Sequence, residues 1–254
     1  MGVVAQEAAR VGAAVVAEAR RTDPAAGELK GAGDYVTAVD RRSEDAIGRF
    51  LAGATPSIPM VGEEAGGARG DRYWSVDPLD GTTNFLLGFP AVAVSVALVD
   101  DGRPVAGAIE APFLDLSFRA VRGRGAWSKD GRLRVSARPV DRAVVSMAFP
   151  FRRKALFARY VPVVERVIDV VEDLRRPGSA ALDLAWVAAG VFDGYFEINV
   201  SEWDLAAGAL LVEEAGGVVS DWDGGPDYLR GEILAGSPVT HAALLEAVRA
   251  AGAG

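Results

Sequence analysis

The chain has 254 residues, half of them apolar and 24% charged, and its net charge at pH 7 is −8. This composition allows one large or two smaller domains with packed cores, and it excludes a disordered or fibrous chain. The sequence has no cysteine and one histidine, His241, which excludes disulfides, thiolate metal sites and a cysteine nucleophile and leaves little for a histidine-based site.

The first half predicts two helices followed by an antiparallel sheet. Residues 2–21 and 40–54 have the apolar spacing of amphipathic helices, and Asp40 is placed to cap the second one. The strands that follow are expected at 57–62, 72–77, 91–113 (a hairpin turning at 100–102), 114–123 and 132–137. Residues 1–137 therefore predict an α+β unit.

In the second half of the sequence, predicted strands alternate with predicted helices. Helices are expected at 152–170, 178–190, 203–217 and 239–251, and the last of these is expected to be a surface helix with His241 in its first turn. Strands are expected at 143–149, 172–176, 193–200, 218–222 and 232–237. This alternation predicts an α/β unit over residues 138–254.

Membrane and nucleic-acid functions are disfavoured. The longest apolar run, 91–99, is too short to cross a bilayer, and the first predicted helix carries acidic and basic residues that a signal peptide lacks. The acidic net charge argues against non-specific nucleic-acid binding. We therefore expect a cytoplasmic protein that contacts neither membrane nor nucleic acid directly.

The stretch "VDPLDGTTNF", residues 76–85, places two carboxylates at a stiff corner. Asp77 and Asp80 flank Pro78 and Leu79, and Gly81 lets the backbone approach a ligand closely. The threonines that follow begin a helical turn whose free N–H groups suit phosphate oxygens, while carboxylates suit Mg²⁺. Taken alone, the string is also compatible with an ordinary turn and a helix cap.

Further acidic groups stand at comparable places. Glu63 and Glu64 end a short strand, Asp204 opens a helix, and Asp40 follows an extended run. In a chain with almost no histidine and no cysteine, this repetition favours a metal site built from carboxylates over four separate caps and turns.

These segments resemble the signatures of the inositol monophosphatase family, the lithium-sensitive, Mg²⁺-dependent sugar and polyol phosphatases. The likeness rests on "GEE" (62–64), "DPLDGTTNF" (77–85) and "WDLAAGALLVEEAGG" (203–217), and it extends to "LKGAGDYVTAVD", "GRGAW" and "GSAALDLAWVAAG" in the same order. The resemblance implies a layered αβαβα sandwich and covers most of the chain, apart from residues 150–172.

The resemblance also implies a metal centre. Glu63, Asp77 and the backbone carbonyl of Leu79 would hold one Mg²⁺, and Asp77 would be shared with a second ion. That second ion would bind Asp77, Asp80 and Asp204, a third, weaker ion would lie near Glu63, and Mn²⁺ could replace Mg²⁺. Two ions about 3.5–4 Å apart can generate the nucleophile and stabilise the leaving oxygen of an in-line displacement.

The roles implied for the substrate and the water fall on nearby residues. Gly81 and Thr82 would bind phosphate through their N–H groups, and Asp40 with Thr82 would orient the attacking water. The polyol hydroxyls would meet Asp80, Ala180 and Glu197.

Three further residues are also candidates. Lys30 could attract phosphate or be an ordinary solvated surface lysine, and Glu64 neighbours a ligand position. Arg175, with Arg176 beside it, could contact a second phosphate or lie at a subunit interface, and we favour the interface.

The expected activity is hydrolysis of myo-inositol 1-phosphate, with fructose 1,6-bisphosphatase or dual specificity as the alternative. The alternative outside the enzymes is a regulatory protein that binds the transcription machinery. Because members of the family are commonly dimers, the resemblance also implies a homodimer.

Overall fold

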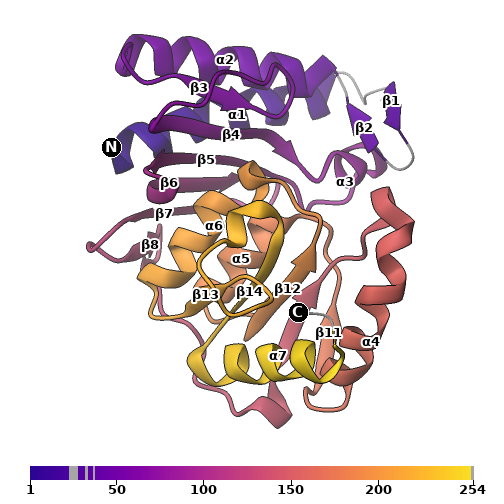
Figure 1. Ribbon diagram of the computed structural model, residues 1–254. Helices are drawn as coiled ribbons and strands as arrows, with labels where there is room; N and C mark the ends of the chain where they lie inside the picture. The colour runs from indigo at the N-terminus through magenta and orange to yellow at the C-terminus, as the bar shows by residue number, and fades with distance from the viewer. Residues whose placement is uncertain (23–27, 32–33, 37, 253–254) are drawn as a thin grey trace.

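The structure is a computed structural model that describes residues 1–22, 28–31, 34–36 and 38–252. Its elements form five layers, helices–sheet–helices–sheet–helices, which are stacked from top to bottom in Figure 1. The outer helices of the first half are α1 (Gly2–Thr22) and α2 (Ala38–Ala54), and those of the second half are α4 (Phe157–Ile168) and α7 (Pro238–Ala250). The predicted αβαβα sandwich is therefore confirmed.

The larger sheet has seven strands in chain order. All neighbours are antiparallel except the first pair, β3 and β4. Its strands are β3 (Met60–Gly62), β4 (Arg72–Asp80), β5 (Ala93–Asp100), β6 (Arg103–Ala111), β7 (Leu116–Val121), β8 (Ala126–Ser128) and β9 (Gly131–Arg132). A separate two-stranded hairpin, β1 (Glu28–Gly31) with β2 (Asp34–Val36), precedes α2.

The smaller sheet is mixed and has the order β11-β10-β12-β14-β13. Strand β10 runs parallel to β11 and to the central β12, whereas β14 is antiparallel to β12 and β13. Its strands are β10 (Val144–Met147), β11 (Asp173–Arg175), β12 (Gly194–Ile198), β13 (Val218–Ser220) and β14 (Glu232–Gly236).

The middle layer consists of α5 (Ala180–Ala188) and α6 (Glu202–Glu214), which contact strands of both sheets. Nearly every residue of α6 from Leu205 to Val212 is buried, because a helix between two sheets has no solvent face. Gly107 of β6 permits the close approach, since a Cβ there would lie 2.9 Å from the Cα of Ala207. The boundary predicted at residue 137 lies between β9 and β10, and the division into two subdomains stays a prediction.

Several predicted elements differ in detail. Residues 133–137 are not a strand, because the N–H groups of Leu133 and Val135 bond to Ala126 and to Ala215 after α6, outside any ladder. The helix predicted from residue 152 begins at Phe157 instead, after a 3₁₀ segment interrupted by the non-helical Arg153 (φ −131°, ψ 72°).

One predicted role at a helix start is wrong, and one side chain at a helix start is more buried than its helix. Helix α2 begins at Ala38, so Asp40 lies inside its first turn rather than capping it. His241 is in the first turn of α7 as expected, but it is buried against β13, where its Nε2 lies 2.8 Å from the Oγ of Ser220. Burial lowers the pKa of His241.

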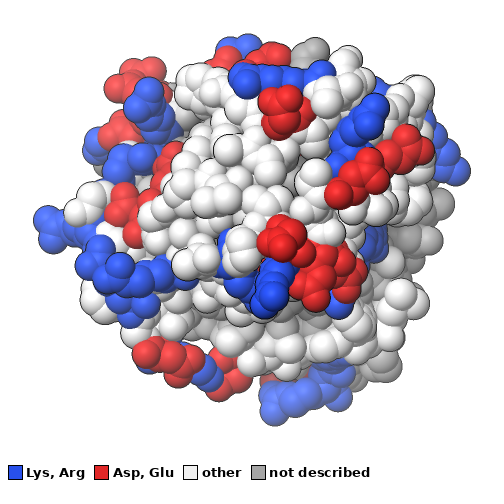
Figure 2. All heavy atoms as spheres, turned by 90° about the horizontal axis from the view of Figure 1, so that it is seen from below, with Lys and Arg blue, Asp and Glu red and all other residues white. Residues whose placement is uncertain are grey.

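Charges of both signs share the surface of the lower face. Figure 2 shows acidic and basic side chains beside one another around a broad uncharged area, so the acidic excess is not gathered into one patch there. Among the helices in the described part of the chain, none combines the length and the apolar character that crossing a membrane requires.

Candidate active site

A cavity of about 330 Å³ opens where the two sheets and the middle helices meet. Its wall combines the end of β4, the start of α3 (Thr82–Leu87), the loop before α5, the end of β12 and the start of α6. Segments far apart in the sequence are thus brought to one place, as the sequence predicts for the acidic motifs.

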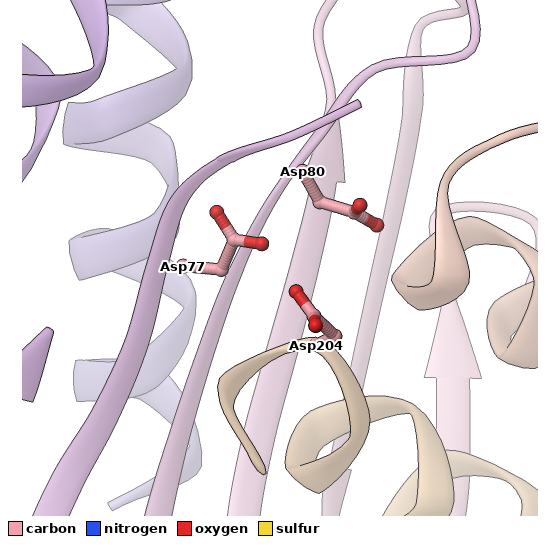
Figure 3. Close-up of side chains that lie close together, drawn as sticks. All are labelled: Asp77, Asp80 and Asp204. Atoms are coloured by element: carbon pink, nitrogen blue, oxygen red, sulfur yellow. The ribbon is translucent and has the colours of Figure 1, made fainter. Parts of the chain in front are cut away.

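Three carboxylates converge in this cavity. Asp77 and Asp80 come from β4 and Asp204 comes from α6, and Figure 3 shows them pointing toward one another. One carboxylate oxygen from each lies within 4.8 Å of the others. Glu63, which follows β3, lines the same cavity. Such closely spaced oxygens are suited to a hard divalent cation.

An irregularity in the strand pairing turns Asp77 and Asp80 to one side. Residues three apart in a regular strand point to opposite faces. Here Asp77 pairs with Ser95 and Asp80 with Ala93, so three steps along β4 match two steps along β5. This extra residue, a β-bulge, brings both carboxylates to the same face. The N–H of Leu79 donates to Asp77 Oδ1 at 2.9 Å and fixes the turn.

Gly81 is required where β4 passes into α3. Its φ of 90° lies in the left-handed region, and a Cβ there would come 2.8 Å from the carbonyl oxygen of Ala91. The chain can therefore reverse direction and present the first turn of α3 to the cavity.

The start of α6 is tied to β5 and is capped by its own residues. Ser95 of β5 donates to the carbonyl of Trp203 at 3.0 Å, and Asp204 accepts the N–H of Ser201 at 3.0 Å through Oδ2. Asp204 therefore takes part in capping the helix while its carboxylate also faces the other two acids.

The pair Asp40–Thr82 lies beside the carboxylates. The hydroxyl of Thr82 is 3.2 Å from Asp40 Oδ1 and also 3.2 Å from the carbonyl oxygen of Leu79. Asp40 is buried, so its carboxylate is held next to the hydroxyl and away from bulk water.

Ala180 and Glu197 also line the cavity. Asp80 Oδ2 accepts hydrogen bonds from the hydroxyl of Ser179 (2.6 Å) and the N–H of Ala181 (2.8 Å), which docks the start of α5 onto β4. Glu197 accepts a hydrogen bond from the Tyr195 hydroxyl.

Burial and mutual repulsion raise the pKa values of these acids. Burial, followed by the charges of Glu63, Asp204 and Asp80, raises the pKa of Asp77 well above its ordinary value. Burial and Asp204 raise the pKa of Asp80 to about 7, and burial raises that of Glu197 to about 8. A divalent cation would offset this repulsion, so the oxygen-only donor set fits Mg²⁺ or Mn²⁺.

The structure places most of the predicted site residues on the cavity wall. They are Glu63, Asp77, Leu79, Asp80, Gly81, Thr82, Ala180, Glu197 and Asp204. Asp40 touches the wall through Thr82.

Three candidates are placed otherwise. Arg175 is exposed and pairs with Asp173, so it lies on the surface. Glu64 donates its N–H to Glu44 and is not part of the cavity's described wall. Lys30 is in β1, and its side chain lies outside the described part of the structure.

Arg152 and an aromatic segment of the wall were missed, and Arg176 was named only beside Arg175. Arg152 and Arg176 line the cavity together with Phe149 and Phe151, and the guanidinium of Arg176 lies 5.5 Å from the Phe151 ring centre. It is therefore Arg176, not Arg175, that faces the site. The sequence signal for Arg176 was its position directly before Pro177-Gly178 and the start of α5, which carries site residues.

Comparison with known proteins gives one consistent family. The model of the inositol monophosphatase family matches residues 1–253. An inositol-1-monophosphatase of Mesorhizobium japonicum is 47% identical over 227 residues, 87% of this chain and 85% of that protein. The Nus factor SuhB of Escherichia coli K12 is 42% identical over 252 residues, 97% of this chain and 94% of that protein.

Solved structures agree. The extragenic suppressor protein SuhB of Bartonella henselae has a TM-score of 0.91 at 40% identity and covers 97% of each chain. An inositol monophosphatase of Anabaena has a TM-score of 0.86 at 33% identity, covering 98% of this chain and 95% of that one. The chain belongs to the inositol monophosphatase family.

Proposed function

We propose that this phosphatase-family chain hydrolyses the phosphate monoester of a small polyol, with myo-inositol 1-phosphate as its substrate. The observation that carries the proposal is the convergence of Asp77, Asp80 and Asp204 beside the Thr82–Asp40 pair. The relatives named as inositol monophosphatases support the choice of polyol.

The residues that would hold Mg²⁺ follow from their positions. Asp77, Asp80 and Asp204 would bind one ion, and Glu63 with Asp77 and the Leu79 carbonyl would bind another. Bound Mg²⁺ would lower the pKa of water and neutralise charge on the phosphate during an in-line displacement.

Thr82 and Asp40 would position the attacking water. Because Thr82 can direct its hydrogen to Asp40 or to Leu79, its oxygen remains able to accept a hydrogen bond from water. Deprotonation of the water is then assisted by a carboxylate that is buried and already aligned.

The polyol would occupy the part of the cavity that Asp80, Ala180 and Glu197 line. Asp80 and Glu197 offer carboxyl groups there and Ala180 provides a small surface, so ring hydroxyls could be bound without a steric conflict. The hydrogen bonds from Ser179 and Ala181 keep one oxygen of Asp80 in place.

A second substrate is favoured by one feature. Arg152 and Arg176 put two cationic groups on the wall of a cavity otherwise rich in carboxylates. Guanidinium groups bind phosphate strongly, so fructose 1,6-bisphosphate is the alternative substrate.

The names of several relatives favour a second, non-enzymatic role. Several relatives at 41–43% identity are named Nus factor SuhB, which supports binding of the transcription machinery as an additional function. The catalytic carboxylates would not be needed for that role, so the two functions can be separated by mutation.

A phosphate-release panel tests the proposal. Purified protein with Mg²⁺ is given inositol 1-phosphate, fructose 1,6-bisphosphate, histidinol phosphate and 3′-phosphoadenosine 5′-phosphate, and kcat/KM is compared. We expect inositol 1-phosphate to be the best substrate. A higher value for the bisphosphate would select the alternative, and no release from any of the four would contradict the phosphatase proposal.

A further inference from the structure

One face of α2 is directed at the candidate site. Asp40, Ser43 and Glu44 stand at positions i, i+3 and i+4 of the helix, and all three are buried. Each contacts a segment that carries predicted residues of the active site. Asp40 contacts Thr82, and Ser43 donates to the carbonyl of Pro78 at 2.9 Å, inside the bulge between Asp77 and Asp80.

Glu44 holds the loop that carries Glu63. Its Oε2 accepts the N–H of Glu64 at 2.8 Å, and its Oε1 accepts the N–H of Ala65 at 2.7 Å. A carboxylate that accepts two backbone N–H groups fixes both the position and the orientation of the loop. The side chain is buried, so water cannot easily replace these bonds.

The loop itself is closed at its base. Gly62 and Gly66 exchange two backbone hydrogen bonds, of 2.9 and 3.1 Å, and the N–H of Glu63 donates to the carbonyl of Val76 at 3.2 Å. These contacts hold the base and one edge of the loop, and Glu44 holds the remaining N–H groups.

The absence of a side chain at residue 62 makes room for this contact. A Cβ on Gly62 would lie 2.5 Å from the Cδ of Glu44, which no real contact allows. A substitution there would displace the Glu44 carboxylate without removing it, which gives a second way of disturbing the same contact.

We propose that Glu44 is a positioning residue of the metal centre: it fixes the loop bearing Glu63 relative to the strand bearing Asp77 and Asp80. The proposal rests on the metal-dependent function proposed above. It adds that metal affinity depends on a carboxylate that does not itself line the cavity's described wall.

Glu44→Gln is the informative change. Glutamine keeps the size of the side chain but offers one acceptor oxygen and an NH₂ group, so one of the two loop N–H groups would face a donor. Residues that orient metal ligands typically contribute about 10–100-fold to metal affinity. We expect Mn²⁺ binding, measured by electron paramagnetic resonance and by calorimetry, to weaken by about that factor.

A matched control separates positioning from general stability. Thr55 follows α2, is buried, and accepts the indole N–H of Trp74 at 2.9 Å. Thr55→Val removes that hydrogen bond, which joins the end of α2 to β4, but touches no ligand loop. Both variants should lower the melting temperature of the metal-free protein, and Glu44→Gln alone should weaken Mn²⁺ binding.

The possible results distinguish a failure of the proposed function from a failure of the positioning role. Wild-type protein that binds no Mn²⁺ would overturn the proposed function and this inference together. Wild-type binding with an unchanged dissociation constant in Glu44→Gln would overturn the positioning role alone. Should Glu44→Gln not fold, Gly62→Ala decides, because a folded Gly62→Ala protein with wild-type Mn²⁺ affinity would also overturn it.

Discussion

Thr82 donates a hydrogen bond to Asp40 across 3.2 Å, although the two residues are 42 positions apart in the sequence. One lies at the start of α3 and the other in the first turn of α2. Because the buried acid can receive the hydroxyl proton, the contact has the geometry expected of a group that activates water.

Thr82→Ala tests this contact. The change removes the hydroxyl and keeps the backbone N–H, so KM for inositol 1-phosphate should change little while kcat falls by roughly 10²-fold or more. Asp40→Asn should have a similar effect. The double variant should lose much less than the sum of the two, because the residues act as one unit. Independent losses of melting temperature with intact turnover would indicate a structural pair instead.

Asp204→Asn separates metal binding from helix capping. Asparagine keeps an acceptor for the N–H of Ser201 but loses the negative charge. We expect the melting temperature of the metal-free protein to stay close to wild type, or to rise, and kcat to fall by orders of magnitude, on the scale of several kcal/mol. Asp204→Ala should lose both properties. Near wild-type turnover in Asp204→Asn would mean that the residue is a cap only.

The stability of the metal-free protein should fall as pH rises. An acid whose pKa is higher in the folded than in the unfolded protein binds extra protons when folded, so its contribution is present at low pH and is lost as pH rises through the folded value. For Asp80 that loss runs from about 4 to about 7, and for Glu197 it continues to about 8.

The same acids predict how Mg²⁺ acts. Since metal competes with protons for the carboxylates, the rise in melting temperature on adding Mg²⁺ should be larger at pH 8 than at pH 5. Thermal unfolding with chelator and with Mg²⁺ at both pH values measures this. An equal or larger rise at pH 5 would show that the carboxylates are not the binding groups.

Arg176→Ala tests whether a second phosphate is bound. Both arginines are exposed, but Arg176 lines the cavity whereas Arg175 pairs with Asp173 outside its described wall, so Arg175→Ala is a matched control. We expect Arg176→Ala to raise KM for fructose 1,6-bisphosphate by more than it raises KM for inositol 1-phosphate. Equal effects of the two alanine variants on both substrates would remove the case for bisphosphate binding.

Local sequence patterns predicted the part of the site that carries Asp77 and Asp80. Pro78 and the spacing of Asp77 and Asp80 indicated a turn that gives both acids one direction, and the structure realises it as a β-bulge. The five-layer fold was predicted by the same family motifs that marked the ligands.

Features that depend on distant packing could not be predicted in this way. Glu44 resembles any helix acid in the sequence, and its role appears only when β3 packs beside α2. Arg176 lines the cavity and Arg175, the last residue of β11, does not, and the sequence alone does not show where that strand ends. The burial of His241 depends on β13, which precedes it by about 20 residues and packs against α7.

Metal-dependent phosphate release is the most direct test of the central claim, that these carboxylates form a catalytic metal centre. Purified protein is treated exhaustively with chelator, assayed on inositol 1-phosphate, and assayed again after Mg²⁺ is added. We predict no release without metal and full recovery with Mg²⁺, because without the ion nothing lowers the pKa of the attacking water or neutralises charge on the phosphate. Full activity in the chelated protein would contradict the claim.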